Sequence, residues 1–337
     1  MKILCRQDSG KRFRQLSGFG KVFSDIGCDF IFWNGEKKST FDAFYEQNPD
    51  IYICSTSDVD SALIKCLKKH SNTKVILIGS LSHEEVSNNK FAKVNEIENV
   101  KSMFNEIGKP DLIIGNCSSF TFDKCMSVWK NLGCNTIASP VASDFYLSVN
   151  PLIVEKFISD VVHIGNFTDY KSKDLEEILF PLHYDDSINL KIFSKKEWPL
   201  TSYLGFINNH DLKNVIKSSK ICAVISKAHT KKFGFGAPQF LFDVLSSGGF
   251  PICDYSEDVN FLLGDYLLLA KNKDEYLNMV YDMLKQDSKR TEMSLAAQSF
   301  VLNNHTYHHR LIDILVNINM EDLAIKISDN LLKRKGD

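Results

Sequence analysis

The stretch ICAVISKAHTKKFGFGAPQFLFDVLSSGGFPICD, residues 221–254, decides the expected fold. Its opening apolar run, ICAVIS, predicts a buried strand, and the loop that follows carries two glycines. Residues 238–247 predict a helix that ends at a glycine pair, and FPICDY (250–255) predicts another strand. A strand, a glycine-bearing loop, a helix and a second strand form one step of a parallel α/β sheet, in which ligands bind beyond the carboxyl ends of the strands.

The same alternation of strand-like and helix-like segments runs along the whole chain. The expected strands are residues 2–6, 29–34, 51–55, 74–80, 111–116 and 135–140, and then 161–166, 190–194, 221–226, 250–255 and 266–270. Helices are expected at residues 13–26, 58–69, 122–132, 171–182 and 238–247. Short continuous strands between helices predict parallel sheets covered on both faces.

We therefore expect an α/β protein with two Rossmann-like domains that face a cleft. The first domain is predicted to span residues 1–150 and the second residues 151–315, because 337 residues exceed one ordinary core. The proline-interrupted segment 139–156 is the expected linker. The last residues, 316–337, predict an amphipathic helix that packs back on the first domain.

Composition and charge are those of an ordinary soluble protein. The net charge is −2, so a polyanion would need a local basic patch. The nine cysteines are scattered without CxxC spacing, which predicts reduced core thiols rather than a zinc or redox site. We find no signal-peptide pattern and no membrane-spanning run, and we expect a cytoplasmic protein, in the host cytoplasm if the protein is viral.

Three further stretches resemble one family of enzymes. They are VVHIGNFTDYKSKDLEEIL (161–179), IFSKKEWPLTSYLGFINNHDLKNVIKSSKICAVIS (192–226) and HTYHHR (305–310). In order and spacing they resemble the group-1-like, CgeB-like glycosyltransferases, which are also common in tailed phages. The resemblance implies the GT-B fold, with an acceptor domain first and a sugar-nucleotide domain second. Residues 1–150 resemble this family only in being α/β.

The resemblance implies a donor site in the second half of the chain, with a UDP-sugar as the expected donor and no cofactor. Gly165 and Asn166 follow a strand and precede a helix, where backbone N–H groups and the helix dipole favour a diphosphate. A tight strand-to-helix turn explains the glycine equally well. Trp198 is a candidate for stacking on the base, with ordinary packing as the alternative.

The loop after ICAVIS gathers cations beside flexible backbone. Lys227 and His229 are candidates for contact with the donor, and Lys231 and Lys232 add charge. Cations suit the developing negative charge of a leaving nucleoside diphosphate. Phe233 and Gly234 complete the predicted donor loop, although such residues are also common in solvated loops.

The helix before the glycine pair carries Asp243. The family usually has a glutamate here that binds the ribose hydroxyls, and a shorter carboxylate can accept the same two hydrogen bonds. Gly248 is expected to end the helix, to approach the donor, or both. At two positions the chain differs from the residues that many family members carry, which weakens the assignment of the family's donor-binding roles to this chain. Phe240 stands in place of an arginine, and Ser194 stands in place of a glycine.

The catalytic base of an inverting enzyme would lie in the first domain or at the linker. Asp8, His83 and Asp144 are the candidates, and each could instead be a cap or turn residue. A retaining enzyme of this fold needs no such base. The terminal His305, Tyr307 and Arg310 are expected to act as a structural lock.

We expect no metal, because no DxD pair stands at a strand end. The acceptor stays open: a glycan, a protein, or a hydroxymethylated DNA base as in phage glycosyltransferases. For a DNA acceptor, the basic residues near the N-terminus are candidates for contact with phosphates, with a solvated helix face as the favoured alternative: Lys11, Arg12, Arg14 and Lys21.

Other classes are a sugar-nucleotide epimerase and a catalytically degenerate sugar-nucleotide-binding module. A dehydrogenase is disfavoured, because no strand is followed by GxGxxG.

Overall fold

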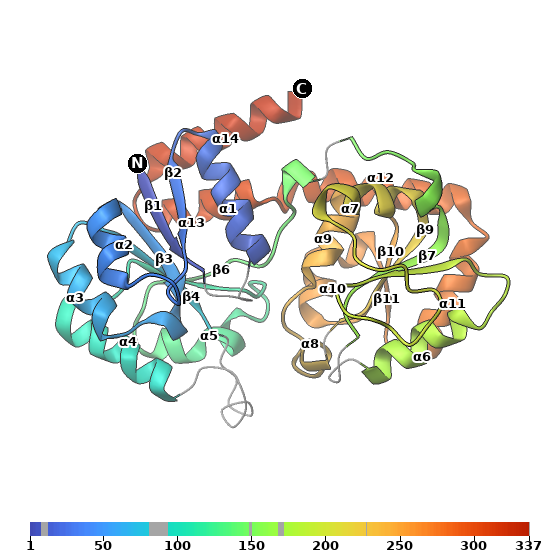
Figure 1. Cartoon of the computed structure of the whole chain (residues 1–337), viewed down its shortest axis with the longest axis horizontal. Coiled ribbons are helices and arrows are strands. Elements are labelled where there is room, and N and C mark those ends of the chain that lie inside the picture. Colours follow the sequence, from blue (N-terminus) through green and yellow to red (C-terminus); the bar gives the residue numbers. More distant parts are fainter. Residues whose placement is uncertain (8–12, 81–93, 148–149, 168–171, 227, 337) are drawn as a thin grey trace. The chain divides into compact units, whose positions relative to one another are not determined.

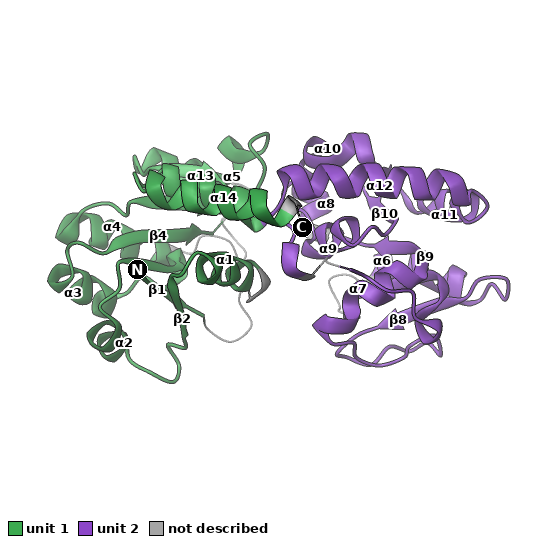
Figure 2. Ribbon diagram, turned by 90° about the horizontal axis from the view of Figure 1, so that it is seen from above, with its two compact units in different colours: residues 1–140, 307–337 green, residues 141–306 purple. Residues whose placement is uncertain are grey.

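The computed structural model describes residues 1–7, 13–80, 94–147, 150–167, 172–226 and 228–336. The chain forms two compact units (Figure 2): unit 1 is Met1–Pro140 with Tyr307–Asp337, and unit 2 is Val141–Thr306. The divisions fall earlier than the expected residues 150 and 315. The physical reason is that Val141 already packs in the core of unit 2, whereas the helix that starts at Tyr307 packs in unit 1.

Within the described residues, the sheet of unit 1 has six parallel strands in the order β2-β1-β3-β4-β5-β6 (Figure 1). These are β1 (Lys2–Arg6), β2 (Asp29–Trp33), β3 (Ile51–Ser55), β4 (Lys74–Gly79), β5 (Leu112–Gly115) and β6 (Thr136–Ala138). The inner strand β5 is buried along its whole length, whereas the edge strand β2 is largely accessible. Continuous apolar runs therefore became inner strands, as expected for a sheet covered on both faces.

The helices of unit 1 come from both ends of the chain. They are α1 (Phe13–Asp25), α2 (Thr40–Gln47), α3 (Ser61–Lys69), α4 (Val94–Ile107), α5 (Phe122–Asn131), α13 (Tyr307–Val316) and α14 (Glu321–Gly336). Local sequence fixes several starts: the Asp60 side chain, for example, caps α3 by accepting from the Leu63 N–H at 2.8 Å.

Both C-terminal helices pack on α1. The sequence predicted this for residues 316–337, which contain α14, but it assigned nearly all of α13 to the second domain. Gly18 makes the approach possible, because a Cβ at this position would lie 2.1 Å from Cδ2 of the Tyr307 ring. Tyr307 also packs edge-on against Phe19, with ring centroids 5.5 Å apart. Farther along, Arg334 of α14 pairs with Asp25 at the end of α1.

The sheet of unit 2 has the order β11-β10-β9-β7-β8, again with parallel pairs throughout the described residues. Its strands are β7 (Ser159–Ile164), β8 (Leu190–Phe193), β9 (Ser219–Val224), β10 (Pro251–Asp254) and β11 (Leu268–Ala270). The chain passes from β7 to β8 on one side and later returns to β9 on the other. The topological switch point, where ligands bind in such sheets, therefore lies at the carboxyl ends of β7 and β9.

Helices cover both faces of this sheet (Figure 1). They are α6 (Ser172–His183), α7 (Asn209–Ser218), α8 (Ala228–Phe233), α9 (Gln239–Ser246), α10 (Glu257–Leu263), α11 (Lys273–Leu284) and α12 (Asp287–Asn304). The core on one face is built with α7, α9 and α12, and the core on the other face with α6 and α11. The predicted α/β architecture of two parallel-sheet domains is confirmed.

The cysteines are free thiols, and all except the partly exposed Cys134 are buried. Burial raises the pKa of the Cys222 thiol, so this group stays protonated and inert at neutral pH. In the described part of the chain, no helix combines the length and the apolar character needed to cross a bilayer.

Candidate functional site

The carboxyl edge of the unit 2 sheet carries most of the residues that the sequence singled out. The loops after β7 and β8 form one part of this edge, the segment between β9 and α9 a second, and the turns after β10 and β11 a third.

The turn after β7 is tied to the turn after β8. The Gly165 N–H donates to Phe193 O at 3.0 Å, and Asn166 Oδ1 accepts from Ser194 Oγ at 2.9 Å. A Cβ at Gly165 would lie 2.9 Å from Nε2 of His163, so a larger residue would have to displace this ring, and packing already favours a glycine. Asn166 is exposed beside it. The predicted contact of both residues with a diphosphate remains a prediction.

Trp198 lies in the core of unit 2 and is only 6% exposed. Its indole N–H donates to Gly165 O at 3.0 Å, and its ring packs against His163 and Phe167, with centroids 5.4 and 5.1 Å away. These contacts make Trp198 a packing residue that supports the Gly165 turn. Its stacking on a base remains a prediction.

The segment after β9 contains the short helix α8 and two glycines in the left-handed region. Gly234, at φ +78°, ends α8 by donating its N–H to Thr230 O at 2.9 Å. The Gly236 N–H then donates to Oδ2 of the buried Asp258 at 2.6 Å. Phe233 and Phe235 stack with centroids 5.8 Å apart. The loop is thus held against α10 in a fixed shape.

Two predicted cations of this loop are not described in full. Lys227 lies outside the described residues, and His229 has its backbone in α8 with its side chain outside the description. Lys232 is exposed and stands over the Phe233 ring.

Asp243 is buried in α9, with an exposed fraction of 5%. Its Oδ1 accepts from Gln239 Nε2 at 3.3 Å, and the same amide donates to Ala142 O at 2.8 Å. Phe240, at the position of the missing arginine, packs against the adjacent core. Ribose binding by Asp243 remains a prediction.

The glycine pair ends α9 in the way that the sequence predicted for a helix cap. Gly248 has φ +69°, and the Gly249 N–H donates to Val244 O at 2.9 Å. A Cβ at Gly249 would lie 2.4 Å from Cγ2 of Ile216. Helix geometry and packing therefore account for both glycines, and a donor contact of Gly248 stays a prediction.

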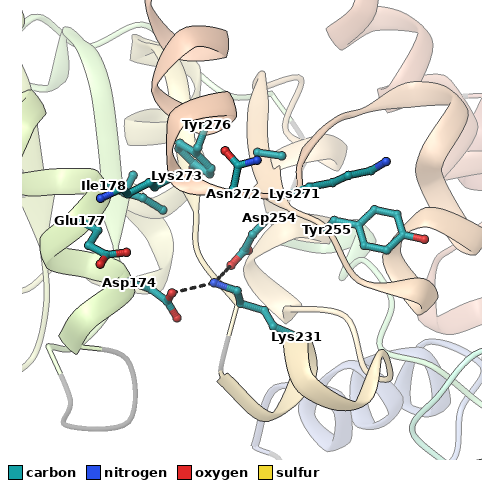
Figure 3. Close-up of a pocket in the computed structure, with 11 residues that line it drawn as sticks. Asp174, Glu177, Ile178, Lys231, Asp254, Tyr255, Lys271, Asn272, Lys273 and Tyr276 are labelled. Carbon is teal, nitrogen blue, oxygen red and sulfur yellow. Dashed lines mark hydrogen bonds and ion pairs between the residues drawn. The ribbon is translucent and has the colours of Figure 1, made fainter.

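A pocket of about 280 Å³ opens beside the ends of β10 and β11 (Figure 3). It is lined by residues of α6, α8 and α11, by the last residues of both strands, and by the turns that follow them. The lining residues are Asp174, Glu177, Ile178, Lys231, Asp254, Tyr255, Ala270, Lys271, Asn272, Lys273 and Tyr276.

Charged groups from three separate elements meet in this pocket (Figure 3). Lys231 of α8 bonds Oδ1 of Asp174 on α6 at 2.7 Å, and its Nζ lies 3.7 Å from Oδ2 of Asp254 at the end of β10. Burial opposes the charge of Lys231, but the two carboxylates outweigh it and raise its pKa. Burial also raises the pKa of Asp254, although the Ser226 N–H and Lys231 favour its ionised form.

The sequence reasoning missed Asp254 and Asp174. One signal was present, because Asp254 ends the strand FPICD and so had to stand at the carboxyl edge of the sheet. Asp174 gave no comparable signal, since its approach to Lys231 depends on how α6 and α8 pack.

Of the three candidate bases, the structure describes only Asp144. Asp8 and His83 are outside the described residues. Asp144, from the expected linker 139–156, belongs to unit 2, where it is buried and accepts from the Tyr146 N–H at 3.1 Å. This contact is that of a turn residue, and catalysis by any of the three remains a prediction.

The terminal motif makes structural contacts. Arg310 is buried, and its Nε donates to Pro140 O at 2.9 Å, so it ties α13 to the end of the first chain segment of unit 1. His305 O accepts from the Ser143 N–H at 2.8 Å in unit 2. Burial lowers the pKa of Arg310 to about 10, which leaves it charged at neutral pH. Across the described residues, no group of three or more His, Cys, Asp and Glu is arranged to hold a metal ion.

Comparison with known proteins places this architecture among glycosyltransferases. Residues 173–316 match a protein-family model described as "Glycosyl transferase-like". A search of curated protein sequences finds no match to the chain.

Three solved structures cover nearly the whole chain at low sequence identity. An alpha-glucosyltransferase in complex with UDP and DNA containing an HMU base has a TM-score of 0.66 at 10% identity, covering 95% of this chain and 99% of that one. HepE from Anabaena, in complex with UDP and glucose, has a TM-score of 0.65 at 11% identity, covering 95% and 99%. Sucrose-phosphate synthase from Thermosynechococcus elongatus has a TM-score of 0.63 at 10% identity, covering 93% and 97%.

The two parallel-sheet units match the GT-B fold of these neighbours over both chains. The family match covers most of unit 2, including the segments that follow β8, β9, β10 and β11, but it begins after the Gly165 turn that follows β7. Together the family match and the fold confirm the enzyme class that the sequence predicted, a glycosyltransferase.

Proposed function

We propose that the protein transfers a sugar from a UDP-sugar donor to a hydroxyl acceptor without a metal ion. The observation that carries the proposal is the glycosyltransferase family match over the unit whose carboxyl edge bears the predicted donor residues. Two neighbours add support for UDP as part of the donor. HepE is in complex with UDP and glucose, and the alpha-glucosyltransferase is in complex with UDP and DNA.

The donor would lie at the switch point of unit 2, beyond β7 and β9. There the Gly165 turn would face the diphosphate, and Asp243 would accept from the ribose hydroxyls. His229 and Lys227 would stabilise the leaving UDP in place of a metal. Asp8, His83 and Asp144 stay the candidates for a base if the sugar is inverted.

We further propose that the chain belongs to the CgeB-like group, on the strength of HTYHHR at residues 305–310 and the spacing before it. A cytoplasmic location is part of this proposal, since the free thiols suit a reducing compartment.

A thermal-shift series with nucleotides and sugar nucleotides tests the donor. Stabilisation by UDP and its sugar conjugates, and not by the corresponding GDP compounds, is the expected result, because a ligand that binds only the folded state raises the melting temperature. The same series without magnesium and with EDTA tests metal independence, and a loss of turnover in EDTA would contradict it.

Two variants test the donor position. Asp243→Ala and His229→Ala should each weaken UDP binding while thermal unfolding without ligand stays cooperative. Unchanged UDP affinity in both variants would show that the donor lies elsewhere.

A hydroxymethylated DNA base is the second candidate acceptor. Two structural neighbours favour this candidate. One is a DNA-modifying beta-glucosyltransferase, and the other is an alpha-glucosyltransferase in complex with DNA that contains an HMU base. Radiolabelled sugar transfer to hydroxymethylated duplex DNA and to oligosaccharides, run side by side, separates the acceptors. Binding to DNA should fall steeply as the salt concentration rises, because counterions are released on binding.

A further inference from the structure

The pocket of Figure 3 adjoins the predicted donor position. It opens at the carboxyl ends of β10 and β11, and it is also lined by α6 and α8, the helices that follow the switch-point strands β7 and β9. Its volume of about 280 Å³ lies at the lower limit of small-molecule sites, which span roughly 300–1,000 Å³. The space therefore suits one ring-sized group and not a whole nucleotide sugar.

Asp254 presents an unsatisfied acceptor to this pocket. The residue is 5% exposed, and its Oδ1 accepts from the Ser226 N–H at 2.8 Å. Its Oδ2 is buried and accepts no hydrogen bond from any described residue, because Lys231 Nζ stays 3.7 Å away. Lys231 itself is held at 2.7 Å by Asp174. Buried polar atoms without a hydrogen bond are rare, and each one calls for an explanation such as strain, a functional role or a bound partner.

The rest of the lining offers both kinds of hydrogen-bonding group. Asp174 and Glu177 supply acceptors, and the Lys271 ammonium and the Asn272 amide supply donors. Asn272 uses its Oδ1 to cap α11, so its amide NH₂ is the part that can serve a ligand. Tyr255 adds an aromatic side chain that is 37% exposed.

This mixture selects among ligand classes. The lining holds as many ammonium groups as carboxylates, so neither an anion nor a cation finds a surface of one opposite sign; the carboxylates are Asp174, Glu177 and Asp254, and the ammonium groups are those of Lys231, Lys271 and Lys273. Sugar hydroxyls donate and accept at once, and the C–H face of a pyranose packs on an aromatic ring. A neutral ring with several hydroxyls therefore satisfies the whole lining.

We propose that this pocket binds a pyranose ring, with Asp254 Oδ2 accepting a hydrogen bond from one of its hydroxyls. The ring has two possible sources: the sugar of the nucleotide donor, or a separate saccharide. Only the first source rests on the proposed function.

The test is equilibrium binding measured by calorimetry on the full chain. The probes are UDP, then UDP-glucose, UDP-galactose and UDP-N-acetylglucosamine, and then the methyl glycosides of the same three sugars. The test variants are Asp254→Asn, which keeps the shape and an acceptor for Ser226, and Tyr255→Ala, which removes the accessible ring without touching the ion pairs.

Asp160→Asn is the matched control. Asp160 also holds one lysine and one backbone N–H, Lys220 at 2.8 Å and Asn189 at 2.9 Å, but it stands at the opposite, amino end of the same sheet. A cooperative thermal transition in all variants shows that any loss of binding is local. If Asp254→Asn fails to fold, Tyr255→Ala carries the test.

Losing a hydrogen bond to a charged group should weaken sugar binding by about 10- to 100-fold. If a pocket variant binds a UDP-sugar more weakly but binds UDP as the wild type does, the bound ring is the sugar of the nucleotide donor. A loss confined to a methyl glycoside, with all nucleotides unchanged, identifies a separate saccharide. Either result supports the proposal, and Asp160→Asn should match the wild type in both.

The proposal is overturned if both pocket variants bind every probe as the wild type does, or if the wild type gains nothing from a sugar and binds no glycoside. Those results leave the proposed function intact as long as UDP binds. Absence of UDP and UDP-sugar binding by the wild type counts against the proposed function instead, and the glycoside series then decides the pocket alone.

Discussion

Two aspartates of unit 2 are equally buried, at 5% exposure each, yet they stand in different surroundings. Asp243 lies on α9 and shares a hydrogen bond with Gln239 of the same helix. Asp254 ends β10, accepts from the Ser226 N–H in the loop after β9, and directs its second oxygen toward Lys231 among the pocket-lining residues (Figure 3). The family resemblance made Asp243 a candidate for ligand binding because of its position in the sequence. Asp254 becomes a candidate because the sheet topology places it at the carboxyl edge.

We expect the largest effect from a substitution at the end of α9, where a clash would lower the stability of the fold. Gly249→Ala puts a methyl group 2.4 Å from Ile216 Cγ2 and 3.2 Å from the Val244 carbonyl oxygen, so we expect a loss of roughly 3 kcal/mol in the free energy of unfolding. Chemical denaturation measures it. UDP affinity of the folded fraction should be unchanged, and a loss of affinity would mean that this glycine contacts the donor.

Asp243→Asn separates the two aspartates directly. If Asp243 accepts from the ribose, the variant should lose about 2 kcal/mol of UDP binding, because hydrogen bonds to charged groups contribute about 1.5–3 kcal/mol. Asp254→Asn should leave the affinity for UDP alone unchanged, and calorimetry compares the two. Equal losses in both variants would show that the aspartates serve one site.

Gly248→Ala should cost less than Gly249→Ala. The position has φ +69°, and a Cβ there would lie no closer than 3.3 Å to the side chain of Gln298, so the cost is the left-handed backbone of about 1–2 kcal/mol. Gly248→Asn is the control, since asparagine tolerates this conformation better, and it should recover part of the stability lost on thermal unfolding. Equal stability of the glycine and alanine forms would contradict the helix-cap role.

The smallest expected effect is a pH dependence with opposite signs at Asp254 and Asp160. Burial raises the pKa of Asp254 in the folded state, so its contribution to stability is present below the unfolded value of about 3.9 and is lost as the pH rises through the folded value. Relative to Asp254→Asn, the wild type should therefore lose stability as the pH rises above about 4.

Asp160 should behave in the opposite way. Burial opposes its charge, but Lys220 and the Asn189 N–H outweigh this and lower its pKa. Relative to Asp160→Asn, the wild type should lose stability as the pH falls below about 4. Thermal melts of the three proteins between about pH 3 and pH 7 measure both trends, and parallel curves would contradict the assigned environments.

Much of the fold could be predicted from local pattern. The expected helix at 122–132 is α5 (Phe122–Asn131), and the expected helix at 238–247 is α9 (Gln239–Ser246). Such segments are recognisable because apolar periodicity and a terminating glycine act within a few residues. The domain limits were displaced, because the packing of Val141 and Tyr307 depends on partners far away in the chain.

The candidate site was less accessible to sequence reasoning. Trp198 could be named as a notable aromatic residue, but only the structure shows it buried against His163 and Phe167. Asp144 could be named as a polar residue near the linker, but only the structure assigns it to unit 2. In each case the deciding contacts join residues from different elements.

The sequence by itself determined the alternation of strands and helices, the glycine that ends α9, and the family resemblance from which we predict that the second half of the chain binds the sugar nucleotide. These features depend on neighbours within one turn or one strand, where residue type acts directly. Only the tertiary structure decided that Asp174, Lys231 and Asp254 share one pocket. They come from α6, α8 and β10, and no local rule fixes the distance between side chains that meet through the packing of a whole sheet.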